Sequence, residues 1–277
     1  MRSMTPAELD EYCARVGYTG PREPTLPVLH ALTSAHARSV PFENLDVLLG
    51  EPIELTVDAL VDKLVRRRRG GYCFEQNGLF LAVLTAFGFA AAPLSARVRL
   101  GRPRDVVPPR THLFLRVELD GATWLTDVGI GGVSLTSAIR WEPDGADQTP
   151  EQPTPHEPRR IVREDGRWFH QVRFGEQWVD AYEFTGEEMP LVDREVGNWF
   201  TSTHPRSHFR HRLMVARAGA DGTRLTLTDT ELKVRDGDGR AESSPIGSPQ
   251  ELLAALDEHF GLRFAAGTTF HPLAVSV

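Results

Sequence analysis

Apolar residues recur at helical spacing through roughly the first ninety residues of the chain. Residues 5–8, Thr-Pro-Ala-Glu, have the form of a capping box with proline at the first helical position, which predicts a helix start. Further helices are expected over residues 26–37 and, with Thr56 as N-cap, over 56–65. Residues 74–87 are apolar on most sides, which indicates a helix buried in the middle of the protein.

From Leu94 the apolar period changes to two, which predicts strands. Asp-Gly at 120–121 and at 165–166 and Gly-Glu at 175–176 fall where hairpin turns should lie. The strands are expected over residues 95–100, 112–119, 122–128, 167–173 and 177–183. Residues 142–158 are rich in proline and polar side chains, which is typical of a surface loop.

The last part of the chain mixes the two patterns. Strands are expected over residues 212–217, 224–228 and 232–235, and a helix follows between the Ser248 N-cap and Gly261. The chain therefore reads as an α+β protein with a helical part at 1–90, an antiparallel β part at 91–210 and a mixed part at 211–277.

Composition narrows the class of protein. Among 277 residues, 40% are hydrophobic and 25% are charged, as in ordinary globular proteins, and the net charge of −7 argues against a nucleic-acid partner. No apolar run is long enough for a membrane span, and residues 1–13 lack the pattern of a signal peptide. With two cysteines only, a disulfide framework is not expected, which favours a cytoplasmic location.

Cys73 follows two glycines and stands where the buried helix should begin. The glycines at 70 and 71 permit a tight turn that brings the backbone close to a bound group. At a helix N-terminus the macrodipole and the unpaired N–H groups favour a thiolate and could stabilise an oxyanion. A lone cysteine is more often structural, as we expect for Cys13, but this context indicates a nucleophile.

The hairpin geometry selects His112 and Asp127 as partners of the cysteine from ten histidines. If residues 120–121 form a two-residue turn, His112 faces Gly129 and Asp127 faces Phe114, so the two are diagonal neighbours about 7–8 Å apart. A carboxylate there would hold the imidazole tautomer and support its charged form. An odd-residue turn would place the two side chains on opposite faces. Singly, a core histidine and a strand-end aspartate are more common, but the chain order Cys, His, Asp favours a triad.

Three other features of the sequence could be functional, but the support for each is weaker. The basic run 66–69 could clamp a phosphate, but we interpret it as an ion-paired or solvated helix end. His204, His208 and His211 have no joining carboxylate, so no metal site is predicted. Residues 129–132, Gly-Ile-Gly-Gly, lack the following helix of a nucleotide loop and are expected to form a flexible turn beside the active site.

Taken together, these residues give the chain a likeness to a known family: it resembles the arylamine N-acetyltransferases. The matching segments are residues 40–45 (Val-Pro-Phe-Glu-Asn-Leu), 68–77 (Arg-Arg-Gly-Gly-Tyr-Cys-Phe-Glu-Gln-Asn), Thr111-His112, 127–129 (Asp-Val-Gly) and 202–209 (Ser-Thr-His-Pro-Arg-Ser-His-Phe). They spread over most of the chain, and Arg-Gly-Gly-x-Cys with the downstream histidine and Asp-Val-Gly is a specific combination. The resemblance assigns the triad to Cys73, His112 and Asp127.

The resemblance implies a fold of an N-terminal helical bundle, a central β-barrel and a C-terminal α/β lid, with a cysteine-protease-like core. It implies a ping-pong reaction in which Cys73 takes an acetyl group from acetyl-CoA, a co-substrate and not a permanently bound cofactor. His112 would act as base and Asp127 would orient it. The thioester would then acetylate an aromatic amine, a hydrazine or an N-hydroxyarylamine.

The resemblance also implies an acceptor pocket next to the cysteine. The matching positions are Phe42, Thr111, Gly129, Ile130 and Phe209. Ile130 stands where the family commonly has phenylalanine, so a stacking face is lost there and the acceptor preference stays open.

Other activities fit the same residues. An amide synthase of the same family would use this triad to close a macrolactam on a carrier-bound polyketide, although the intact segments 74–77 and 202–205 favour the acetyltransferase. A cysteine hydrolase or transglutaminase would turn over peptide or glutamine substrates without acyl-CoA. A binding module without enzyme activity predicts that Cys73 is alkylated no faster than Cys13. The oligomeric state is not predicted.

Overall fold

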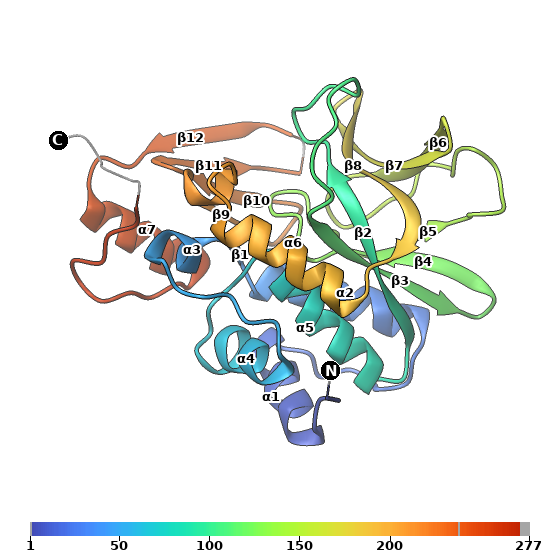
Figure 1. The fold of residues 1–277 in the computed structure, drawn as a ribbon, viewed down its shortest axis with the longest axis horizontal. Helices are drawn as coiled ribbons and strands as arrows, with labels where there is room; N and C mark the ends of the chain where they lie inside the picture. The colour runs from blue at the N-terminus through green and yellow to red at the C-terminus, as the bar shows by residue number, and fades with distance from the viewer. Residues whose placement is uncertain (1, 238, 272–277) are drawn as a thin grey trace.

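The N-terminal part of the computed structural model, which describes residues 2–237 and 239–271, is helical (Figure 1). The helices are α1 (Pro6–Val16), α2 (Leu26–Ser39), α3 (Leu45–Leu49), α4 (Val57–Leu60) with a π-helical continuation over Val61–Arg66, and α5 (Cys73–Ala86). The predicted capping box opens α1, where the carboxylate of Glu8 accepts the N–H of Thr5 at 2.8 Å. The predicted central helix is α5, which is buried on most sides and packs against two strands of the large sheet. None of the helices described is long and apolar enough to cross a membrane.

The large sheet has seven antiparallel strands in the order β5-β4-β3-β2-β8-β7-β6. They are β2 (Ala90–Val98), β3 (His112–Leu119), β4 (Ala122–Thr126), β5 (Ile139–Trp141), β6 (Arg159–Glu164), β7 (Arg167–Phe174) and β8 (Gln177–Glu188). The edge strands β5 and β6 meet through Gln152. Its side chain bonds the backbone of Arg140 at both N–H and C=O, and its own backbone pairs with Arg159. The sheet is therefore a nearly closed barrel, as expected.

The hairpin of β3 and β4 has the predicted two-residue turn and register. Leu119 pairs with Ala122, and the turn residues Asp120 and Gly121 have φ values of 52° and 72°, as a type I′ turn requires. The second strand ends at Thr126, two residues before the predicted end, because the chain then turns toward α5.

A second sheet of five strands, in the order β1-β9-β10-β11-β12, forms the C-terminal part. Its strands are β1 (Phe42–Glu43), β9 (Met214–Ala218), β10 (Arg224–Thr228), β11 (Glu231–Arg235) and β12 (Ala241–Pro245). The predicted last helix, α7 (Pro249–Phe260), packs on this sheet through Leu252, Leu256 and Phe260. β1 comes from the N-terminal part of the chain and the other four strands come from the C-terminal part, so this sheet joins the two parts. The division at residues 90 and 210 stays a prediction.

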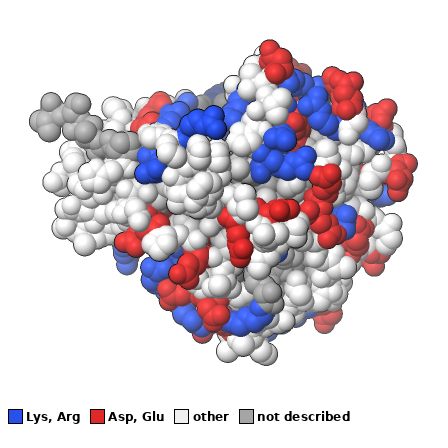
Figure 2. All heavy atoms as spheres, in the orientation of Figure 1, with Lys and Arg blue, Asp and Glu red and all other residues white. Residues whose placement is uncertain are grey.

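Between the two sheets runs α6 (Leu191–Thr203), followed by a 3-10 turn over His208–Arg210. It lies over the start of α5 (Figure 1), where a Cβ at Gly197 would come within 2.6 Å of the Phe74 ring. On the face seen in Figure 2, acidic and basic side chains are interspersed, with Lys and Arg grouped along the upper part of the molecule.

Candidate active site

Cys73 is the first residue of α5, as the sequence predicts. The N–H of Tyr72 donates to the Glu75 carboxylate at 3.0 Å, which caps the helix and holds the loop before it. Cys73 as a residue is 4% exposed, and its Sγ lies 3.5 Å from the carbonyl oxygen of Thr111. The nucleophile candidate therefore sits at a capped helix N-terminus.

Gly70 and Gly71 lie against other parts of the chain at distances that leave no room for a side chain. A Cβ at Gly70 would lie 2.0 Å from the Pro41 carbonyl oxygen, and one at Gly71 would lie 2.6 Å from the Glu75 carboxylate. These two glycines therefore let the loop pack against its own chain, and the expected close approach of this loop to a bound group stays a prediction.

Buried charges fix the same loop. Arg69 donates to Glu43 at 2.8 Å and to Asp46 at 2.7 Å, and Lys63 pairs with Asp46 at 2.8 Å and with Glu75 at 2.6 Å. Burial would raise the pKa of Asp46, but the charges of Lys63 and Arg69 hold it below its usual value. Burial raises the pKa of Glu75 to about 7 against the charge of Lys63. Removing one member would leave a buried charge unpaired, so the cluster holds its elements in one arrangement.

The rest of the basic run is ion-paired or exposed, as interpreted from the sequence. Arg66 bonds Glu11 and Arg67 bonds Asp62, each at 2.8 Å. None of the residues 66–69 lines the cavity beside Cys73, so the run offers no phosphate clamp there.

His112 and Asp127 meet at the open end of the hairpin. Their Nε2 and Oδ2 atoms lie 2.7 Å apart, and both side chains are buried. Cys73 is close enough to His112 to affect the pKa of its imidazole. Burial alone would lower the pKa of His112, but the charge and hydrogen bond of Asp127, together with Cys73, raise it to about 10. The site therefore favours an imidazolium between a carboxylate and a thiol.

Asn77 ties this pair to the helix of the nucleophile. Its Nδ2 donates to Asp127 Oδ1 at 2.9 Å and to the Leu113 carbonyl oxygen at 2.7 Å, and its Oδ1 accepts the N–H of Val128 at 3.1 Å. We did not predict a role for Asn77. Its spacing of four from Cys73, which puts both on one helix face, was the available signal.

Gly129 passes directly against the start of α5. Its N–H donates to Asp127 Oδ1 at 3.0 Å, and a Cβ at this position would lie 2.8 Å from Cys73 Cα. Because only a residue without a side chain fits there, Gly129 sets how closely the hairpin approaches the nucleophile.

A cavity of about 860 Å³ opens at Cys73, within the usual size of small-molecule sites. All the predicted pocket positions line it: Phe42, Thr111, Gly129, Ile130 and Phe209. The rings of Phe42 and Phe209 have their centroids 6.1 Å apart. The sequence reasoning missed a part of the lining, residues 107–109 (Val-Pro-Pro), which come from the β2–β3 loop.

Cationic side chains also line this cavity. Arg102 and Arg206 pair with no carboxylate in the described part of the chain, whereas Arg212 bonds Asp229 at 3.0 Å. Burial and the charges of Arg102 and Arg212 lower the pKa of His208 to about 4. A molecule with an anionic end could therefore be held here.

The histidines of the 204–211 segment have separate surroundings. His204 stacks on Phe200 at 4.5 Å, and His211 donates to the Pro205 carbonyl oxygen at 2.6 Å. Over residues 2–237 and 239–271, no group of three or more His, Cys, Asp or Glu side chains is arranged to hold a metal ion.

Known proteins share this sequence and fold. A family model described as N-acetyltransferase matches residues 25–269. The arylamine N-acetyltransferase of Mycolicibacterium smegmatis is 45% identical over 92% of each chain, and that of Escherichia coli K12 is 40% identical over 94% of this chain and 90% of its own. The structure of Mycobacterium marinum arylamine N-acetyltransferase in complex with CoA has a TM-score of 0.86 at 39% identity, covering 91% of this chain and 92% of that one. The chain therefore belongs to the arylamine N-acetyltransferases, a family of acyltransferases.

Proposed function

We propose that this chain moves an acetyl group from acetyl-CoA to an arylamine, a hydrazine or an N-hydroxyarylamine through a thioester on Cys73. The main support is the Cys73–His112–Asp127 arrangement at a cavity with aromatic and cationic walls. An acyl carrier and an aromatic acceptor can use such a cavity in turn.

In the first half-reaction His112 holds the proton of the Cys73 thiol, and the thiolate attacks the acetyl carbonyl carbon. The positive end of α5 supports negative charge on the sulfur and on the developing oxyanion. As the tetrahedral intermediate collapses, the carbon–sulfur bond to CoA breaks and His112 returns the proton to the departing CoA thiolate. Asp127 keeps Nε2 of His112 occupied, which leaves Nδ1 for the reacting sulfur.

In the second half-reaction the amine nitrogen attacks the thioester carbon. His112 accepts the proton that the nitrogen loses, and Cys73 leaves as a thiolate. The products are the acetylated amine and the resting enzyme, so each half-reaction balances without a further reactant.

We assign the two parts of the cavity to the two substrates. Arg102 and Arg206 supply positive charge for the phosphates of acetyl-CoA, and Phe42 and Phe209 supply aromatic surface for the acceptor. Ile130 adds apolar surface without a ring, so a phenylalanine there (Ile130→Phe) is expected to shift the preference toward acceptors that stack.

A cytoplasmic location is part of the proposal. Cys13 and Cys73 are both free thiols, the state that a reducing compartment maintains. Acetyl-CoA as donor requires the same compartment to supply it.

Intact-protein mass spectrometry tests the reaction. Acetyl-CoA should add one acetyl group to Cys73, and an arylamine should then remove it. Cys13→Ala, the matched control because Cys13 is the other cysteine, should still form the adduct, and Cys73→Ala should not.

Failure of acetyl-CoA to label a Cys73 that still alkylates rapidly would refute the proposed donor and favour the amide synthase. An adduct that water removes but an amine does not would instead indicate a hydrolase.

A further inference from the structure

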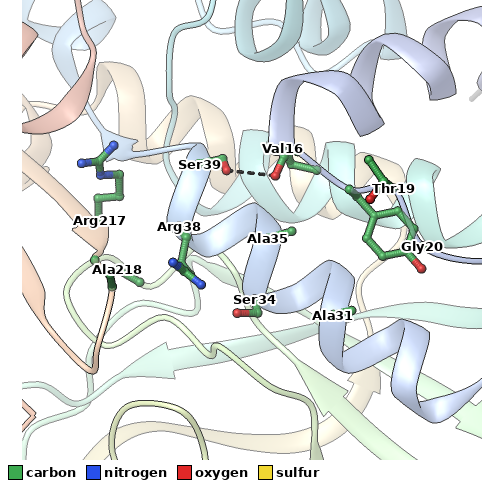
Figure 3. A pocket seen from close by; sticks show the side chains of 14 residues that line it. Val16, Thr19, Gly20, Ala31, Ser34, Ala35, Arg38, Ser39, Arg217 and Ala218 are labelled. Carbon is green, nitrogen blue, oxygen red and sulfur yellow. Dashed lines mark hydrogen bonds between the residues drawn. The ribbon is translucent and has the colours of Figure 1, made fainter.

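A second cavity, of about 690 Å³, lies where α2, the end of α1 and the end of β9 meet (Figure 3). Ala31, Ser34, Ala35 and Arg38 face it from α2, at the spacing of one helix face. Residues 16–20 and 217–220 form the other walls. Because most of these side chains are small, the three segments leave a space between them. β9 separates this cavity from the active site, which residues 214–216 line.

The cavity carries positive charge and no negative charge. No Asp or Glu lines it, while Arg38 from α2 and Arg217 from β9 both do, with guanidinium groups that point in different directions (Figure 3). The Nε of Arg217 is buried and has no hydrogen-bond partner within the described residues. Arg15 lies nearby, and burial together with the charges of Arg68 and Arg217 lowers its pKa to about 10. Arg15 itself does not line the cavity and donates to the carbonyl oxygens of Leu64 and Arg68.

Arg38 is exposed and Arg217 is half-buried, and neither has a carboxylate partner within the described residues, unlike three fully buried arginines of the molecule. Arg99 pairs with Glu183 at 2.6 Å, and Arg159 and Arg224 pair with Glu157 at 2.8 and 2.7 Å. Taking a charge out of water is unfavourable unless an opposite charge compensates it. The chain has a net charge of −7, so acidic side chains are abundant and yet none is placed here. The half-buried charge of Arg217, which has no carboxylate partner within the described residues, therefore favours an anion from outside the chain.

We propose that this cavity binds a small phosphate monoester, with the phosphate against Arg38 and Arg217. Guanidinium groups match the oxygens of phosphate in both charge and geometry, and Ser34 adds a hydroxyl to the same wall. The cavity is larger than a bare oxyanion needs, and its remaining walls carry neutral small side chains and the ring of Tyr18. The organic part of the ester lies against these walls.

Calorimetric titration of phenyl phosphate into the full chain, at low salt and without sulfate, tests the site. A saturable binding event at this cavity is expected beside any binding at Arg102 and Arg206. The double variant R38Q/R217Q should weaken it at least tenfold, since each arginine provides a charge-assisted contact. The matched control R102Q/R206Q removes two unpaired arginines from the active-site cavity and should leave this binding within about threefold. R38Q alone changes an exposed side chain, so it tests the site even if Arg217 is needed for folding.

Three results would overturn the proposal. The first is the lack of saturable binding to the wild-type chain. The second is loss of binding in R102Q/R206Q together with full binding in R38Q and R38Q/R217Q, which would place the anion in the active-site cavity. The third is equal affinity for inorganic phosphate and phenyl phosphate, which would exclude an ester as the ligand class. R38Q should keep full acetyl transfer to an arylamine.

Discussion

Replacing Asp127 by asparagine should stop catalysis through the hydrogen-bond directions around that residue. Oδ1 of Asp127 accepts N–H groups from Asn77 at 2.9 Å and from Gly129 at 3.0 Å, so the atom at that position must remain an acceptor. In Asp127→Asn the amide oxygen takes this position, and the NH₂ group faces Nε2 of His112. Nε2 must then accept a hydrogen bond, and the imidazole proton moves to Nδ1, which can no longer take the proton of Cys73.

The expected loss is on the order of 10⁴-fold in the rate of thioester formation, as for the same change in serine triads. This loss corresponds to about 5 kcal/mol of transition-state stabilisation. The two side chains have nearly the same volume and His112 becomes neutral, so no buried charge is left unpaired. The variant should therefore stay folded, but its melting temperature should fall because it loses the stability that the raised pKa of His112 contributes at neutral pH.

Rapid-quench measurement of Cys73 acetylation by acetyl-CoA gives this rate directly. Asp120→Asn is the matched control, since it makes the same change at the exposed turn of the same hairpin, where asparagine tolerates a positive φ. A rate for Asp127→Asn within about tenfold of the wild type would refute the tautomer argument. An equal loss in Asp120→Asn would show that the hairpin fold, and not the hydrogen-bond direction, was affected.

Further predictions concern packing and charge. Gly129→Ala places a methyl group 2.8 Å from Cys73 Cα and should lower the free energy of unfolding by about 1–3 kcal/mol in urea melts. In the control Gly247→Ala the nearest atom to the new methyl group lies at 3.4 Å, so the free energy of unfolding should change by less than about 0.5 kcal/mol. Burial lowers the pKa of His112, but Asp127 outweighs this effect and raises that pKa from 6.5 to about 10 on folding. The protonated His112 therefore stabilises the folded state fully below pH 6.5, and this stabilisation is lost as the pH rises through about 10. The difference in unfolding free energy between the wild type and His112→Gln should therefore shrink across this range, and a growing difference would contradict the assignment. Glu157→Gln should lower the free energy of unfolding by about 3–5 kcal/mol, because three guanidinium groups surround that carboxylate. The same change at the exposed Glu151 should lower it by less than about 1 kcal/mol. Equal losses for the two variants in denaturant melts would contradict this prediction.

Features that depend on neighbouring residues were predictable from the sequence. The I′ turn at 120–121 sets the register that brings His112 and Asp127 together, and the start of α5 places Cys73 at a helix N-terminus. Each of these follows from the order of a few residues along the chain, because turn type and capping are local properties.

Elements that depend on distant partners were not predicted. α6 is an example, since it buries Arg194, Gly197 and Thr201 and exposes Val192 and Val196, which inverts the usual apolar pattern. Other strands are short or charged: β5 has three residues, and β6 reads Arg-Arg-Ile-Val-Arg-Glu. The contacts of Asn77 and the ion pairs of Arg69 likewise join parts of the chain that no periodicity connects.

The two-residue strand β1 makes the active site late to assemble during synthesis. It pairs with Val215 and Ala216 of β9 on one side and with Gly71, in the loop before Cys73, on the other. About 170 residues separate the two strands, which a ribosome adds in roughly 10–30 s. During this interval β1, which pairs with the Cys73 loop, lacks its own partner strand β9. Losing the C-terminal sheet would therefore remove a support of the nucleophile loop as well as a wall of the cavity.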